Sequence, residues 1–282
     1  MQYLLLIMVI VFMSLQNVFQ KQYNIKSEQP NVFLFGGFTS IAALLFFVVT
    51  SGFRLDFNPD FFPYSFGFGI TYAMSLIGLV YAIRYGSLAI STLAISYSLL
   101  IPTLYGIMFL DEKISINTCI GILFLIVSIF LINAKKSETK FTLKWGIFIL
   151  MAFLGNGFCS TFQKMEQNAM NGAYKSEFMI VALIITTLIM FTMVFVSKGK
   201  VKSELKLCAV NALPSGIANG IVNLFVMLLT GSMPNAILFP SVSAGGIVLS
   251  FILAILVYKE RLTKKQNLGY VFGIASVILL NL

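Results

Sequence analysis

Amide side chains recur at helical spacing inside strongly apolar stretches of the chain. Asn219 and Asn223 are four residues apart, and Asn156, Ser160 and Gln163 follow one another at i, i+4 and i+7. Residues at these spacings lie on one face of a helix. An amide in such a stretch is costly unless it faces other protein groups or water. The pattern therefore predicts polar helix faces that bind a small solute, with hydrogen bonds between helices as the alternative.

Other polar residues in apolar stretches extend this candidate substrate-binding set. Its remaining members are Gln16, Asn17, Tyr72, Ser75, Tyr97, Ser241 and Ser243. Amides, hydroxyls and aromatic rings suit a neutral or zwitterionic solute. The middles of the apolar stretches contain no Asp or Glu, whereas proton-driven transport of a cation usually places a carboxylate there. An organic cation is therefore the less favoured substrate.

Proline and paired glycine interrupt two of the apolar stretches. Pro102 and Pro240 each remove a backbone donor from a helix, and Gly245 and Gly246 add backbone freedom. Interrupted segments in corresponding halves of a chain point to the binding site of a transporter. We expect these positions to act as kinks and gates, and helix packing is the alternative.

A charged motif stands at the ends of two stretches. Glu112 and Lys113 begin a Glu-Lys-Ile-Ser motif, which recurs as Glu-Arg-Leu-Thr from Glu260 and Arg261. In both copies the acidic residue is followed directly by a basic one. The motif predicts ion pairs at helix ends, or elements of a gate.

The sequence gives little support for catalytic or metal chemistry. It contains no histidine, the commonest general base and metal ligand. Its three cysteines are scattered singly within apolar runs, which is typical of packing residues. We expect no catalytic residue, no metal and no cofactor, and hence no enzyme. An intramembrane lipid-handling protein, either a flippase or a lipid-modifying enzyme, is the alternative function.

The elements that must position the polar residues are membrane-spanning helices. Hydrophobic residues make up 59% of the 282 residues and charged residues 10%, against about 45–50% and about 25% in soluble domains. About 20 apolar residues cross a bilayer. Ten stretches meet that length: 2–20, 32–51, 63–84, 88–109, 115–134, 145–163, 178–197, 206–229, 235–257 and 265–282. The prediction is an all-α, multi-pass protein of the plasma membrane.

The chain also repeats itself. The glutamate motif is followed in both copies by matching glycine, serine and asparagine residues, and Phe-Gln-Lys at 19–21 recurs at 162–164. These matches predict two five-helix repeats, 1–137 and 138–282, in one membrane bundle. Because five is odd, the second repeat enters the membrane inverted, which is characteristic of secondary transporters that work by alternating access. A duplication that only doubled a stable bundle is the alternative.

Most of the 19 Lys and Arg residues follow the odd-numbered stretches. Basic connections face the cytoplasm, which predicts that both termini lie outside. The same loops account for the net charge of +9 without a nucleic-acid partner. The expected partners are a small-molecule substrate and the lipid bilayer; a monomer is sufficient for the mechanism and a dimer is compatible with it.

Taken together, these features resemble the drug/metabolite transporter superfamily, EamA type. The resemblance rests on ten stretches, two five-helix halves, and the paired glutamate motifs, each followed by a glycine. It implies a basket-like bundle whose cavity is lined mainly by the first, third, fourth, sixth, eighth and ninth helices, with no catalytic residue or prosthetic group. It also implies cytoplasmic termini, in conflict with the loop charge, so the orientation is left open.

The sequence thus predicts a secondary transporter for a small polar organic metabolite, neutral or zwitterionic. The resemblance implies amino acids, nucleotide-related solutes or other small metabolites as substrates. We expect an amino-acid-like or nucleoside-like solute, with export as the direction.

Overall fold

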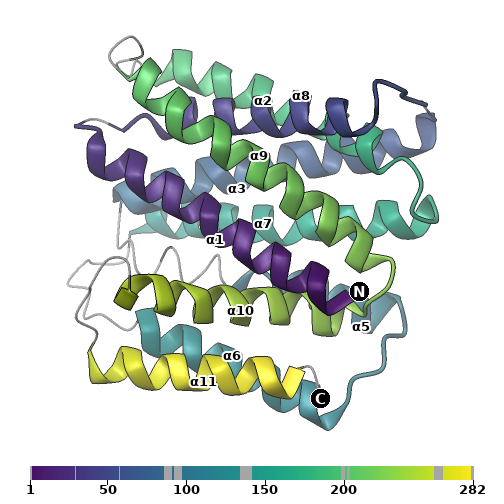
Figure 1. Cartoon of the computed structure of the whole chain (residues 1–282), viewed down its shortest axis with the longest axis vertical. Coiled ribbons are helices and arrows are strands. Elements are labelled where there is room, and N and C mark those ends of the chain that lie inside the picture. The colour runs from purple at the N-terminus through teal and green to yellow at the C-terminus, as the bar shows by residue number, and fades with distance from the viewer. Residues whose placement is uncertain are drawn as a thin grey trace.

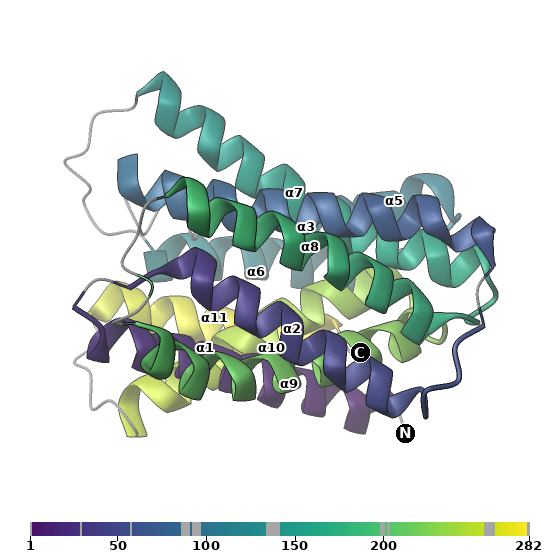
Figure 2. The ribbon, with the colours of Figure 1, turned by 90° about the horizontal axis from the view of Figure 1, so that it is seen from above.

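A computed structural model describes residues 2–28, 30–56, 58–85, 91, 97–133, 142–197, 201, 204–256 and 263–280. Within these residues the chain forms ten α-helices, one short 3-10 helix and no strand. The helices run along a roughly common direction and make an elongated bundle (Figures 1 and 2). The all-α prediction is therefore confirmed for the part of the chain that the structure describes.

The elements follow one another with short connections. The first half contains α1 (Gln2–Lys26), α2 (Val32–Thr50), η1 (Pro59–Phe61), α3 (Phe62–Tyr85), α5 (Leu100–Phe109) and α6 (Ile116–Asn133). The second half contains α7 (Leu143–Ala169), α8 (Lys175–Val196), α9 (Leu205–Thr230), α10 (Asn235–Leu256) and α11 (Lys264–Leu280). Because α7 continues beyond the predicted boundary at 163, Lys164 and Glu166 lie inside a helix.

Side-chain caps explain where several helices begin. The first backbone N–H groups of a helix have no partner within it. The Asn31 side chain accepts a hydrogen bond from Leu34 N in the first turn of α2, and the Thr142 side chain accepts one from Trp145 N in α7. The turn after α7 contains Gly172 at a φ of +74°, a conformation that glycine adopts without steric cost.

Six helical segments are long and apolar enough to cross a membrane by length and composition. They are α1, α2, α7, α8, α9 and the segment Pro59–Ala82. Shorter apolar helices occupy Leu100–Phe109, Ile116–Ile132 and Asn235–Leu249. The predicted fourth stretch, 88–109, is described only at 91 and from 97 onward. Ten membrane spans therefore remain a prediction.

The bundle has two distinct ends. At one of them α1 ends and α9 begins, where Ser27 Oγ donates a hydrogen bond to Glu204 Oε2 at 2.6 Å. At the other, α1 begins and α9 ends, where Gln2 Nε2 donates to Ser232 O at 3.1 Å. We call these the α1–α2 end and the α9–α10 end. Both chain termini lie at the α9–α10 end (Figure 1).

Glycines allow the inner helices to cross closely. A Cβ added to Gly155 of α7 would lie 2.6 Å from Ser75 N of α3, and one added to Gly216 of α9 would lie 2.3 Å from Thr39 O of α2. Only glycine fits at contacts this close. Small residues at the interface are what allow membrane helices to approach one another in this way. Gly220, one turn after Gly216, faces the same helix, where a Cβ would lie 2.5 Å from the ring of Phe46. These crossings hold α3 against α7 and α2 against α9.

Candidate functional site

A cavity of about 600 Å³ lies in the middle of the bundle, lined from α1, α3, α7, α9, α10 and neighbouring helices. Its polar lining consists of amide and hydroxyl side chains: Gln16, Asn17, Tyr72, Asn156, Ser160, Gln163, Asn219, Asn223, Ser243 and Tyr270. Phe68 and Phe239 add aromatic surface. No Asp, Glu, Lys or Arg is among the described residues that line it. The cavity is thus polar without carrying a formal charge.

An amide network on α9 organises one wall of the cavity. Asn219 Nδ2 donates to Gln16 Oε1 of α1 at 3.1 Å and lies 3.5 Å from Tyr72 OH of α3. Asn223 Nδ2 donates to Asn219 Oδ1 at 3.1 Å and to Asn219 O at 2.9 Å. Linked hydrogen bonds of this kind hold side chains in defined orientations. The network therefore joins three helices around the cavity.

A second polar face comes from α7. Gln163 Nε2 donates to Asn223 O at 3.3 Å, which connects this face to the amide network. Asn156 Nδ2 donates to Ser98 Oγ at 2.6 Å, and Ser160 Oγ donates to Asn156 O at 3.3 Å. The i, i+4, i+7 spacing of these α7 residues does place them on one face. That face points into the cavity.

The structure brings most of the predicted polar residues to this one cavity. Those that line it are Gln16, Asn17, Tyr72, Asn156, Ser160, Asn219, Asn223 and Ser243, together with Gly246. Sequence reasoning did not single out the apolar and aromatic lining, including Phe68, Phe239 and Tyr270. Nothing in a single sequence separates an aromatic ring beside a cavity from one in solid packing.

Three predicted binding residues lie elsewhere. Ser75 sits in the crossing of α3 with Gly155 of α7. Tyr97 OH donates to Ile126 O of α6 at 2.9 Å, and Ser241 is 1% exposed. None of the three is among the residues that line the cavity.

The predicted kink positions differ from one another in their surroundings. Pro102 is the third residue of α5, in the first turn, where a missing N–H removes no helical hydrogen bond. Pro240 lies inside α10, which continues through it, and it leaves the carbonyl of Ala236 without its helical donor. A Cβ on Gly245 would meet Ile10 of α1 at 2.2 Å. Pro102 therefore lies in the first turn of α5 without interrupting it, whereas Pro240 removes one hydrogen bond from the first turn of α10.

Glu112 makes contacts across the bundle at the α9–α10 end. Its Oε2 accepts a hydrogen bond from Ala236 N at the start of α10 at 3.1 Å, and its Oε1 lies 4.0 Å from Lys164 Nζ of α7. Lys164 Nζ donates to Thr230 O at the end of α9 at 2.5 Å. The two charged side chains are 10% and 7% exposed. One buried ion pair thus ties α7, α9 and α10 together.

The sequence predicted an ion pair or a gate element at this helix end and named no partner for Glu112. Glu112 does not pair with its neighbour Lys113, which is exposed; Lys164, far away in the sequence, is its partner. The carboxylate reaches inward over Gly106, where a Cβ would lie 2.3 Å from Glu112 Oε2. The matching residues of the second motif, Glu260 and Arg261, lie outside the described residues.

Comparison with known proteins relates the first part of the chain to a transporter family. The model of the EamA-like transporter family matches residues 1–134, which confirms the resemblance to the drug/metabolite transporter superfamily over that segment. No curated protein matches the chain. A solved structure titled only "Crystal structure of protein" is 13% identical, with a TM-score of 0.75 over 100% of this chain and 98% of that chain. At that identity the likeness shows a shared fold.

Proposed function

We propose that this multi-pass membrane protein, whose first half matches the EamA-like transporter family, is a secondary transporter of a small polar organic metabolite. The proposed substrate is neutral or zwitterionic, amino-acid-like or nucleoside-like, and moves by alternating access across the plasma membrane. The observation that carries the proposal is the 600 Å³ cavity with its uncharged network of amides and hydroxyls.

The lining favours solutes without net charge. Moving an ion into an apolar interior is strongly unfavourable unless a partner charge is present, and the described lining offers none. Amide groups both donate and accept hydrogen bonds, so they replace the hydration of neutral polar groups. The rings of Phe68, Tyr72 and Phe239 provide flat apolar surface for the rest of the solute. This combination is typical of small-molecule sites.

Helix directions support alternating access. The rings of Phe33, at the start of α2, and Tyr81, near the end of α3, have centroids 6.0 Å apart. The ring of Tyr85, at the end of α3, stacks on that of Phe148, near the start of α7, with centroids 5.6 Å apart. α7 therefore begins at the α1–α2 end, where α1 finishes, and the two helices run in opposite directions. Inverted halves of a transporter require this relation.

The Glu112–Lys164 pair supports a gate at the α9–α10 end. Gln163 lines the cavity, and Lys164, the next residue, is bound to Glu112 and Thr230. At the opposite end the lining extends to Ile132 in the last turn of α6. The closed gate lies at the α9–α10 end, so we propose that the solute enters from the α1–α2 end in this conformation. The positive-inside rule would place this end in the cytoplasm, which makes the conformation the one in which an exporter loads its solute and an importer releases it.

Counterflow in proteoliposomes tests the proposal. Purified full-length protein is reconstituted, loaded with one unlabelled solute and assayed for uptake of the labelled form, across neutral amino acids, nucleosides, sugars and organic cations. We expect selective counterflow of a neutral or zwitterionic solute. No counterflow of any solute in the panel would overturn the proposal, and movement of labelled phospholipid in the same vesicles would favour the lipid-handling alternative.

A matched pair of variants locates the site. Asn219→Ala with Asn223→Ala removes the network. We expect the half-saturating solute concentration to rise about thirtyfold, because two hydrogen bonds of about 1 kcal/mol each are lost. Asn211→Ala is the control: Asn211 lies on the same helix but donates to Leu207 O at 2.8 Å, outside the cavity. An equal effect of both changes would place the site elsewhere.

A further inference from the structure

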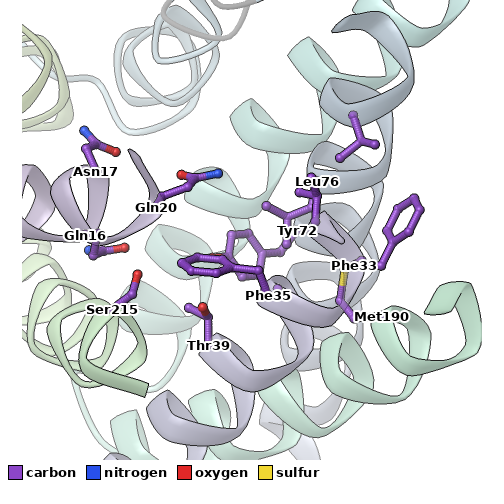
Figure 3. A pocket seen from close by; sticks show the side chains of 13 residues that line it. Gln16, Asn17, Gln20, Phe33, Phe35, Thr39, Tyr72, Leu76, Met190 and Ser215 are labelled. Atoms are coloured by element: carbon purple, nitrogen blue, oxygen red, sulfur yellow. The ribbon is translucent and has the colours of Figure 1, made fainter. Parts of the chain in front are cut away.

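A second, smaller pocket adjoins the cavity. It has a volume of about 100 Å³ and lies between α1, α2, α3, α8 and α9. Gln16, Asn17 and Tyr72 line both spaces. In Figure 3, Gln16, Asn17 and Ser215 stand on one side of the pocket, and Phe33, Leu76 and Met190 on the other. The pocket therefore has a polar wall shared with the cavity and an apolar wall of its own.

The apolar wall is firmly packed. Phe35 stacks on Tyr23 with ring centroids 5.2 Å apart. Met190, on α8, is 1% exposed. Gly36 on α2 lets Met190 pack directly against the α2 backbone, because a Cβ there would lie 3.2 Å from Met190 Sδ. Protein interiors are otherwise close-packed, so this is a preformed apolar space directly beside a polar one.

We infer that this pocket is an apolar subsite of the transport site, which takes one compact apolar group of the solute while the amide network holds its polar part. An engineered apolar cavity of about 150 Å³ accepts benzene, so a pocket of about 100 Å³ suits a branched aliphatic group. The inference rests on the proposed function and narrows its substrate to an amphipathic solute with such a group.

Part of the subsite wall comes from two helices that the family resemblance does not count among those lining the cavity. Gly36 belongs to α2 and Met190 to α8, whereas the resemblance assigns the cavity to other helices. Tyr72 and Gln16 form the boundary, and both contact Asn219. A solute bound to the amide network would therefore have an apolar group within reach of the pocket.

A series of N-acetyl amino-acid amides tests the inference. These probes are uncharged and carry the same amide groups, and only the side chain varies from alanine through valine, leucine and phenylalanine to tryptophan. Isothermal titration of the full-length protein in nanodiscs gives the dissociation constant of each. We expect affinity to rise about fourfold for each buried methylene from alanine to leucine, and to fall at tryptophan, which exceeds the pocket.

Two substitutions change the pocket in opposite directions. Gly36→Leu adds a side chain that presses on Met190 and Leu76 in the apolar wall and reduces the space between them. We expect the leucine amide then to bind no better than the alanine amide. Met190→Ala enlarges it, and we expect the preferred probe to shift to the phenylalanine or tryptophan amide, a gain that misfolding cannot mimic. Met193→Ala on the same helix, outside the lining, is the control and keeps the wild-type order.

The outcomes separate the subsite from the transport function. The subsite is overturned if affinity does not depend on the side chain of the probe, or if Met190→Ala leaves the preferred probe unchanged. In either case, binding of the alanine amide still supports the transport site. Failure of every probe to bind, together with failure of counterflow for all neutral solutes, overturns both.

Discussion

Gln163 and Lys164 are consecutive residues of α7, yet they belong to polar regions of opposite kind. Gln163 lines the cavity and joins an uncharged network of amides through Asn223 O. Lys164 belongs to a charged region at the α9–α10 end, where it contacts Glu112 and Thr230 O. One region is polar without charge and adjoins empty space. The other carries full charges and is closed by protein contacts.

The difference indicates a division of tasks. A hydrogen bond between neutral groups contributes about 1 kcal/mol net, so the amides exchange one partner for another at small cost, as reversible solute binding requires. Removing one partner of a buried ion pair costs about 3–5 kcal/mol. The charged region is therefore suited to holding one end of the bundle shut, and the uncharged region to recognising a solute.

The largest effect is expected when the charged region loses one partner. Lys164→Met leaves Glu112 without its counterion, and we expect the free energy of unfolding to fall by about 3–5 kcal/mol, measured by chemical unfolding in detergent. Adding Glu112→Gln should recover most of that loss. Lys113→Met is the control, since Lys113 is exposed; an equal loss there would show that the wrong lysine has been assigned.

The next largest effect is expected when a negative charge is introduced into the uncharged amide network. Asn219→Asp introduces a carboxylate among the amides, and we expect counterflow of the neutral solute to fall by about tenfold or more, because the buried charge lacks a partner. The same variant should begin to accept organic cations. Undiminished neutral transport with no cation uptake would contradict the idea that the absence of charge sets the specificity.

A steric change disturbs the charged region less. Gly106→Ala places a Cβ 2.3 Å from Glu112 Oε2, and we expect a loss of about 1–3 kcal/mol in stability, as for other overpacked sites. Gly231→Ala provides the matched control, because a Cβ there would lie 3.8 Å from its nearest neighbour, Leu228 O. If the two substitutions cost the same, the position of Glu112 over Gly106 has no energetic consequence.

The smallest effect is a change in labelling rate. Cys159 lines the cavity, whereas Cys119 is exposed on the outside of the bundle. In single-cysteine variants treated with a small methanethiosulfonate reagent, we expect saturating solute to slow modification of Cys159 severalfold and to leave Cys119 unaffected. Equal protection of both thiols would indicate a global change of conformation in place of occupancy of the cavity.

Much of the fold follows from local properties of the chain. Apolar stretches of bilayer length predict helices because a helix satisfies its own backbone hydrogen bonds in lipid, and the described helices agree closely with most of the predicted bounds. Helical periodicity also predicts which amides share a face. Asn219 with Asn223, and Asn156 with Ser160, were placed together on that ground, and each pair lines the cavity.

What the helices contact required the tertiary structure. Ser75 and Tyr72 lie on the same helix and are both polar, but only Tyr72 faces the cavity, because Gly155 brings α7 against Ser75. The motif around Glu112 predicted an ion pair or a gate element without a partner, and the fold supplies Lys164 and the start of α10 as its contacts. Periodicity relates residues within one helix and carries no information about which face of a second helix packs against them.

The sequence by itself therefore determined the membrane class, the helices and the uncharged character of their polar faces, since composition and spacing are properties of the chain alone. Only the tertiary structure decided which of those faces share a cavity, where a buried ion pair joins helices at the α9–α10 end, and that a small apolar pocket lies beside Gln16 and Tyr72. These features depend on close crossings between helices far apart in the chain, which sequence-local rules do not specify.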